Sequence, residues 1–241
     1  WGSGRGGRVV RKELRAGAEE GYVRVEFIHL SDWHIGGKLL NRDRGEDEEC
    51  ILQQITDLAA KERPDAVLIA GDIYDKAVPS AEAVEVFDHF ISGLSSALPD
   101  MAVMLISGNH DSGPRVNCFR SVLSRQNVYM IGLPPRTPEE HIEKAVLTDE
   151  YGDVNFYLLP FVRPSMVKQI TGVDENGNNL SYNDTLHRLI EREEIDQSQR
   201  NVIVSHQFYL PPGRSTGESN RTDDERRPGG TTEEAPTGSC G

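Results

Sequence analysis

The sequence predicts an α/β fold built around a parallel sheet, and two observations support that prediction. From Val25 onward, short apolar segments of strand length alternate with longer segments in which apolar residues recur every three or four positions. This β-α-β-α-β order favours parallel strands joined by right-handed crossovers. In addition, three apolar segments are followed at once by acidic and histidine-bearing strings. Ligands of such sheets usually bind at the carboxyl edge, where these strings would lie.

The first half of the chain supplies three strands and two helices. The segments 25–30, 66–70 and 101–107 are rich in apolar residues, as expected of buried strands. Between them, apolar residues at helical spacing predict helices over 47–61 and 80–98. The 241 residues are enough for one such domain with a substantial core.

The second half continues the pattern with shorter elements. The predicted helices lie at 118–124 and 182–194. The predicted strands lie at 128–131, 145–148, 154–159 and 201–205. The last strand ends next to His206, so a fourth strand tip carries a candidate ligand.

The two ends of the chain differ from the middle in composition. Residues 1–24 are rich in glycine and arginine and have no strand or helix periodicity, which predicts a disordered leader. Residues 211–241 contain no Val, Ile, Leu, Met, Phe, Tyr or Trp, which predicts a disordered tail. The predicted domain therefore spans 25–210. Because the composition changes abruptly after a core-like strand, we expect this domain to be incomplete, with its C-terminal part missing or altered.

Composition excludes several classes of protein. The formal net charge is −13, with the acidic surplus between residues 25 and 210, whereas phosphate binding normally uses clustered Lys and Arg. A polyanionic partner would therefore need metal ions or another subunit. The three cysteines form no C-x-x-C pair, so a zinc finger is not expected. No apolar stretch is long enough to span a bilayer, and residues 1–24 contain no apolar core of a signal peptide. The sequence therefore predicts a cytoplasmic protein that does not associate with a membrane.

The strings that follow the strands carry the residue types of a metal site. They are Asp32-Trp33-His34, Gly71-Asp72-Ile73-Tyr74-Asp75, Gly108-Asn109-His110-Asp111 and the single His206. Alternate residues of a strand point the same way, so Asp-x-His is expected to bring a carboxylate and an imidazole to one sheet edge. Mn²⁺, Fe²⁺ and Zn²⁺ accept carboxylate, amide and imidazole ligands together. The predicted ligands are Asp32, His34, Asp72, Asn109 and His206.

The chemistry expected of this set is phosphoester hydrolysis. Asp72 can bridge two ions through its two oxygens, at the spacing of roughly 3.5–4 Å that lets both ions hold a phosphate. His110 is the candidate general acid for the leaving oxygen. Asp111 is expected to orient His110 by hydrogen bonding, and Asp75 is expected to support the ligands without contacting the metal.

Each string alone also has a structural explanation. Asp-x-His occurs by chance, Gly-Asp-x-x-Asp is a common turn, and Gly-Asn suits a left-handed turn. Their joint position, directly after apolar strands that are separated by helices, favours the metal site over three unrelated turns.

The same strings resemble those of the calcineurin-like metallophosphoesterases and, within them, the nuclease subunits of bacterial SbcCD complexes. The resemblance covers 25–210 and includes the segments 70–85 and 157–164. It implies a four-layer α/β/β/α sandwich and a two-metal, usually manganese-dependent, DNA nuclease that acts as a double-strand exonuclease and hairpin endonuclease. It also implies an SbcC-type ATPase partner and a homodimer packed through helices near the active site.

The resemblance further implies which residue does what. Asp32, His34 and Asp72 would hold one ion, Asp72, Asn109 and His206 the other, and His110 would be the acid. The family's later Gly-His-x-His string, which supplies one more ligand to each ion, has no counterpart after His206. We therefore expect weak metal binding and impaired DNA cleavage by this chain as given. Two alternatives remain open: a phosphoesterase for another substrate, such as a cyclic nucleotide or a phosphoprotein, and an inactive fragment that only docks its partner.

Overall fold

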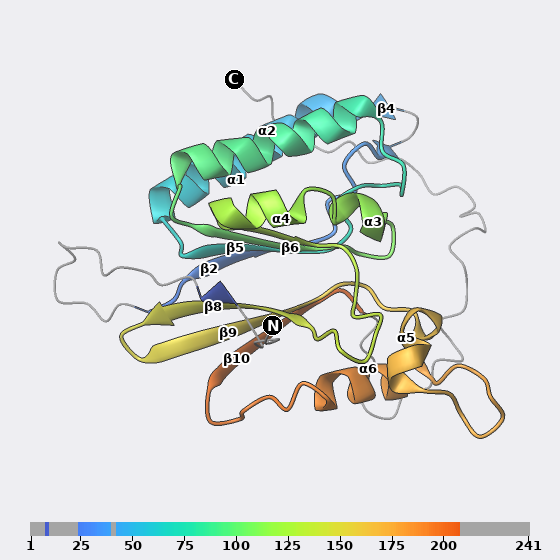
Figure 1. Ribbon diagram of the computed structural model, residues 1–241. Helices are drawn as coiled ribbons and strands as arrows, with labels where there is room; N and C mark the ends of the chain where they lie inside the picture. The colour runs from blue at the N-terminus through green and yellow to red at the C-terminus, as the bar shows by residue number, and fades with distance from the viewer. Residues whose placement is uncertain (1–7, 10–23, 40–41, 208–241) are drawn as a thin grey trace, which may run out of the picture. The chain divides into compact units, whose positions relative to one another are not determined.

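The computed structural model describes residues 8–9, 24–39 and 42–207 (Figure 1). Apart from Arg8–Val9 and Arg24, the predicted leader lies outside the described residues, and so does the predicted tail. Arg8–Val9 form a two-residue strand, β1, which the sequence pattern did not indicate.

The predicted parallel sheet is confirmed. Its strands are β2 (Phe27–Leu30), β5 (Ala66–Ala70), β6 (Ala102–Ile106) and β7 (Val128–Ile131). They lie in the order β2-β5-β6-β7 and every neighbouring pair is parallel. Because all four strands run the same way, the loops that follow them leave from the same edge of the sheet.

Helices cover one face of this sheet. The two long ones are α1 (Gly45–Glu62) and α2 (Ala81–Ala97), followed by α3 (Gly113–Val116), α4 (Arg120–Leu123) and the 3₁₀ turn η1 (Ser124–Gln126). Ser80 caps α2 by accepting a hydrogen bond from the backbone N–H of Ala83. Alternate strand residues, Val67 and Ile69 in β5 for example, pack against the apolar faces of these helices in one core cluster.

A second, mixed sheet follows in the chain. It contains β8 (Glu143–Asp149), β9 (Gly152–Leu159) and β10 (Arg200–Ser205), in the order β1-β8-β9-β10. Strands β8 and β9 form an antiparallel hairpin, while β1 and β10 add to it in parallel. Helices α5 (Pro164–Thr171) and α6 (Tyr182–Glu191) pack on its outer face. A small hairpin, β3 (Lys38–Leu39) with β4 (Arg42–Asp43), precedes α1.

The two sheets pack face to face and form the predicted four-layer α/β/β/α sandwich (Figure 1). The residues of β5 and β6 that point away from α1 and α2, such as Leu68 and Met104, share a core cluster with Phe156, Leu158 and Val204 of the second sheet. Successive residues of β5 and β6 point to opposite faces of the sheet and pack into two separate cores. This explains why both strands are apolar at every position.

Besides the short elements β1, β3, β4 and α3, which were not predicted, one strand and one longer helix differ from the sequence-based expectation. Strand β2 is partly exposed rather than buried, because it lies at the edge of its sheet and has a neighbour on one side only. Helix α5 was not predicted, since its eight residues begin at a proline and are too few for a clear apolar period. Among the described residues, none of the helices combines the length and apolar character needed to cross a bilayer.

A buried ion pair holds the second sheet to the start of the domain. The carboxylate of Asp149, whose side chain is 0% exposed, accepts two hydrogen bonds from Arg200, at 2.9 and 2.6 Å. It also accepts the backbone N–H of Val25 at 2.9 Å and that of Tyr151 at 2.8 Å. The hydrogen bonds from Arg200 outweigh the cost of burial and hold the pKa of Asp149 well below its usual value.

Replacing Arg200 by alanine is therefore expected to destabilise the fold. The change leaves the Asp149 carboxylate buried without its main partner, and we expect a loss of about 2 kcal/mol in the free energy of unfolding. This figure is below that of a fully buried pair because Arg200 itself is 40% exposed. Urea denaturation measures the difference. The control is Arg125→Ala on the exposed η1 turn, which should change stability by less than about 0.5 kcal/mol.

Candidate metal centre

Four strand ends meet at the candidate site, as the sequence predicted. Asp32 and His34 follow β2, Asp72 follows β5, and His206 follows β10. The segment Asn109-His110-Asp111 follows β6. The first three loops leave the parallel sheet, whereas His206 comes from the second sheet, so the site lies across the sandwich at one end of both sheets.

Backbone hydrogen bonds align the first two loops. The N–H of Asp32 donates to the carbonyl of Gly71 at 3.1 Å, and the N–H of His34 donates to the carbonyl of Asp72 at 3.0 Å. Asp32, His34 and Asp72 all have left-handed backbone angles, with φ of 57°, 51° and 50°. Residues other than glycine rarely adopt this conformation, and where they do the surrounding structure must enforce it, often at a functional site.

This geometry also changes the explanation for the Asp-x-His string. Strand β2 ends at Leu30, so Asp32 and His34 lie beyond it and the alternation of a strand does not position them. The residue between them, Trp33, packs its ring edge-on against Phe90 of α2, with ring centroids 5.0 Å apart. The packing of Trp33 and the backbone hydrogen bonds to Gly71 and Asp72 together direct Asp32 and His34 toward the candidate site.

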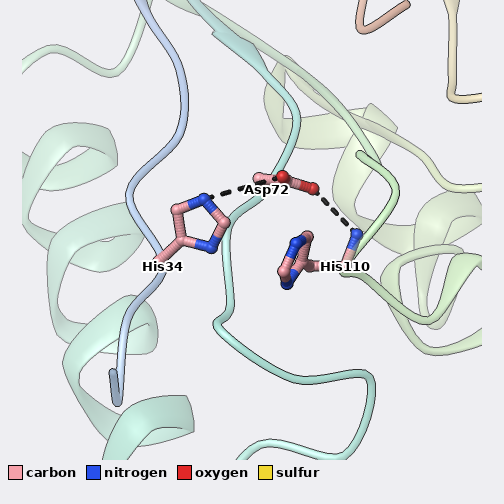
Figure 2. A group of neighbouring side chains, drawn as sticks. All are labelled: His34, Asp72 and His110. Atoms are coloured by element: carbon pink, nitrogen blue, oxygen red, sulfur yellow. Dashed lines mark hydrogen bonds and ion pairs between the residues drawn. The ribbon is translucent and has the colours of Figure 1, made fainter. Parts of the chain in front are cut away.

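Asp72 is the centre of the site. Only 3% of its surface is exposed. One carboxylate oxygen, Oδ2, lies 3.6 Å from Nε2 of His34 and 3.4 Å from Nε2 of His206. The other, Oδ1, accepts the backbone N–H of His110 at 2.9 Å (Figure 2). Burial opposes ionisation of Asp72, but the hydrogen bonds from His206 and from the His110 amide outweigh it, so its pKa is lowered.

Two groups of candidate ligands share Asp72. Among the described residues, the potential ligand atoms of His34, Asp72 and His110 lie within 4.8 Å of one another, and so do those of Asp32, Asp72 and His206. The family resemblance instead implied Asp32 and His34 on one ion and Asn109 with His206 on the other. In both descriptions Asp72 is the residue common to the two ions.

His206 is oriented with its Nε2 toward the other ligands. Its Nδ1 donates to the carbonyl of Ala70 at 2.7 Å, and its Nε2 lies 3.2 Å from Oδ1 of Asn109. Fixing one ring nitrogen in this way is how proteins present the other to a metal. Interaction with the Asp72 carboxylate, against the opposing effect of burial, raises the pKa of His206 to about 9.

Metal binding is therefore expected to depend on pH. Below pH 9 an ion must displace the proton that His206 keeps in the metal-free protein, so the apparent affinity for Mn²⁺ should rise about tenfold from pH 7 to pH 8. Calorimetric titration with Mn²⁺ at both pH values, in buffers of different ionisation enthalpy, measures the affinity and the proton released. In His206→Asn the affinity should be lower and the rise with pH much smaller; an unchanged rise would show that another group is responsible.

His110 and the two carboxylates predicted to support it are arranged through the backbone. Nδ1 of His110 donates to the carbonyl oxygen of Asp75 at 3.0 Å, so Asp75 contacts the ring through its main chain and leaves Nε2 available. The carboxylate of Asp111 accepts backbone N–H groups of Ile73 at 3.1 Å, Tyr74 at 3.0 Å and Gly108 at 2.8 Å. Asp111 thus joins the loops that carry Asp72 and His110.

Two glycines matter for a reason that sequence reasoning missed. Turns were considered only as the alternative explanation for these strings, and no packing role was expected of Gly71 or Gly108. A Cβ at Gly71 would lie 2.6 Å from the His206 ring, and one at Gly108 would lie 2.1 Å from Oδ1 of Asp72. Each glycine lets a neighbouring loop come into contact with a candidate ligand. Their position immediately before Asp72 and Asn109 is the signal that could have indicated this.

The donor set fits divalent metal ions. Carboxylates, imidazoles and one amide oxygen suit Mn²⁺, Fe²⁺ or Zn²⁺, and Nε2 of His206 points toward the shared carboxylate.

Comparison with known proteins gives the family of this chain. The SbcD chain of the nuclease SbcCD from Staphylococcus epidermidis (strain ATCC 12228 / FDA PCI 1200) is 30% identical over 206 residues, which cover 85% of this chain and 50% of that protein. This chain thus spans about half the length of that relative. The model of the family described as calcineurin-like phosphoesterase matches residues 25–227, which include every candidate ligand. The chain therefore belongs to the calcineurin-like phosphoesterase family, whose members are hydrolases that use divalent metal ions.

Proposed function

We propose that this protein hydrolyses phosphodiester bonds of DNA with two divalent ions held on either side of Asp72. The observation that supports this most strongly is the buried carboxylate of Asp72, which lies 3.6 Å from Nε2 of His34 on one loop and 3.4 Å from Nε2 of His206 on another. The 30% identity to a chain of a nuclease favours DNA over other phosphodiesters. Manganese is the proposed metal, because the donor set is of mixed hard and borderline character.

The proposed roles follow the sequence-based assignment. Asp32, His34 and Asp72 hold one ion, and Asp72, Asn109 and His206 hold the other. When bound, such a pair polarises the phosphate and lowers the pKa of water so that a hydroxide can attack in line. The protein contributes a prearranged cluster, because the paired loops and the glycine contacts fix Asp72 and His206 before any substrate arrives.

His110 is the proposed general acid. Its Nδ1 is held by the carbonyl of Asp75, so Nε2 is the nitrogen that can give a proton to the leaving oxygen. The ring lies edge-on to that of His34, with centroids 4.7 Å apart, which places it beside the candidate ligands. Asp111 contributes by holding the loop of His110 against the loop of Asp72.

The proposed partners are DNA and an ATPase subunit of the SbcC type. The acidic balance of the chain, −13 overall, is unfavourable for DNA binding on its own, so a partner that supplies cationic surface is consistent with the charge. Both partners are met in the cytoplasm, which is the proposed location.

The direct test compares the hydrolysis of DNA with that of a small phosphodiester, bis(p-nitrophenyl) phosphate, each with and without Mn²⁺. The proposal expects Mn²⁺-dependent cleavage of hairpin and blunt-ended DNA at a low rate, in keeping with the weak metal binding expected of this chain. It expects His110→Asn to lower kcat roughly 10²–10⁴-fold further, while leaving Mn²⁺ affinity within a few-fold of the parent. Cleavage of bis(p-nitrophenyl) phosphate alone would favour a phosphoesterase for another substrate. Absence of both activities, with the ATPase subunit still binding, would favour the docking fragment instead.

We also propose a homodimer that uses the α4 region. Phe119, at the N-terminus of α4, is 74% exposed and Val122 within α4 is 58% exposed, so two large apolar side chains lie on the surface after α3. Phe119 in addition has a left-handed backbone, with φ of 58°, which is costly for a bulky residue and favours a role beyond packing. A second copy would bury this surface.

Phe119→Asp is expected to convert the dimer to a monomer. A carboxylate at the centre of an apolar contact would lose its hydration on association, and we expect the dissociation constant to rise at least about 100-fold. Light scattering coupled to size exclusion measures the mass. Ile51→Asp is the matched control, because Ile51 is 57% exposed on α1, and this variant should remain dimeric. A parent protein that is monomeric at tens of micromolar would contradict the proposal.

A further inference from the structure

A cavity of about 530 Å³ lies next to the candidate metal centre. Its wall includes Gly36, two residues after His34, and Asp75, whose carbonyl holds the ring of His110. The N–H of Gly37 donates to the carbonyl of His34 at 3.0 Å, so the loop that borders the cavity is the same loop that positions this ligand. The cavity is thus bordered by the loops that position His34 and His110.

The charges around the cavity limit what it can hold. Three acidic residues line it, Glu48, Asp75 and Glu82, and of these Glu48 is paired with Arg44 at 3.3 Å. This acidic lining disfavours a phosphate in the interior. Apolar side chains, Val78 and Val86 among them, form other parts of the wall. A neutral ring with an apolar face and polar edges suits such a lining, and a volume of this size is within the range of small-ligand sites.

The lining of the cavity also includes a lysine, Lys76. Lys76 is exposed and has no ion pair with any carboxylate among the residues that the structure describes. An exposed ammonium group can bind a phosphate oxygen at modest cost because it remains hydrated. The arrangement therefore combines a place for a neutral ring with a cation for a phosphate attached to it.

We propose that this cavity binds a nucleoside next to the scissile phosphate, with Lys76 contacting the phosphate that follows. The inference rests on the proposed function and extends it, because it assigns the residues that would distinguish a nucleic acid from a small phosphodiester. Val78, which is 68% exposed, provides apolar contact for the base or sugar. Base contacts of this kind are tolerant of sequence, since every base has an apolar face.

The test uses a thymidine dinucleotide and its two counterparts in which one or the other base is absent. In Val78→Asp, KM for the dinucleotide should rise about fivefold or more, while KM for bis(p-nitrophenyl) phosphate stays the same. For one of the abasic counterparts the parent and Val78→Asp should have equal KM, because the base that the cavity binds is missing. The matched control is Val173→Asp, 46% exposed and distant in the chain, which should behave as the parent.

A binding measurement separates this inference from the proposed function. Calorimetry with thymidine 5′-phosphate and Mn²⁺ should show binding that Val78→Asp and Lys76→Gln both weaken by about fivefold or more. That result without any hydrolysis would support the cavity and contradict the proposed function. Equal affinity in the parent and both variants, or no binding by the parent, would overturn the inference even if DNA is cleaved. So would tighter binding of an unrelated peptide than of the nucleotide.

Discussion

Asp72→Asn is expected to lower the affinity for Mn²⁺ at least about 100-fold and to abolish Mn²⁺-dependent hydrolysis. The amide keeps the size of the side chain and can still accept the N–H of His110, which Asp72 does at 2.9 Å. It cannot supply charge to two ions at once. The measurements are calorimetric titration with Mn²⁺ and hydrolysis of bis(p-nitrophenyl) phosphate, which does not depend on DNA contacts.

The same substitution has a second readout that needs no metal. The largest cause of the raised pKa of His206, about 9 in the parent, is its interaction with Asp72. In Asp72→Asn this pKa should fall toward the ordinary value of 6.5, which NMR titration of the histidine ring detects. Asp57→Asn on the exposed part of α1 is the control and should leave both affinity and pKa unchanged. If the pKa stays near 9, Asp72 does not interact with His206 as described.

Gly108→Ala is expected to damage the site through contact alone. The added methyl group would lie 2.1 Å from Oδ1 of Asp72 and 2.3 Å from its backbone nitrogen, so one of the two loops must move. We expect a loss of about 1–3 kcal/mol in the free energy of unfolding and more than about tenfold in Mn²⁺ affinity. Urea denaturation and calorimetry measure the two effects.

The control for this prediction is another glycine-to-alanine change. Gly93 lies inside α2, and a methyl group there would meet its nearest neighbour, Thr56, at 3.7 Å, an ordinary contact. Alanine favours helix over glycine, so Gly93→Ala should stabilise the protein by about 0.5–1 kcal/mol and leave metal affinity unchanged. Equal effects at the two positions would contradict the steric explanation for Gly108.

Much of the fold could be predicted from periodicity. The apolar strands at β5 and β6 and the amphipathic helices α1 and α2 have strong local patterns, and their alternation determines a parallel sheet. The four-layer arrangement itself came from the family resemblance. Strand β1 could not be predicted, because two residues have no period and their pairing with β8 depends on a partner more than 130 positions away.

The candidate residues could be named from the sequence, but their geometry could not. The ends of β2 and β5, neighbouring parallel strands, indicated Asp32 and Asp72, and the end of β10 in the second sheet indicated His206. The left-handed backbone at Asp72 and the contact between Gly108 and its carboxylate depend on loops distant in sequence, which a local pattern does not contain. The three backbone N–H groups that donate to the Asp111 carboxylate likewise depend on tertiary contacts, which the sequence around Asp111 does not indicate.

The origin of His206 in the second sheet has a thermodynamic consequence. Strand β10 carries this imidazole to within 3.4 Å of a carboxylate that belongs to the other sheet, so any cation bound by both residues links the two halves of the sandwich. Ions that bind only this assembled form stabilise it by an amount that grows with the logarithm of their concentration. The stability of the folded domain and the binding of metal ions are therefore linked. Sequence changes at the interface between the two sheets will alter the affinity for these ions.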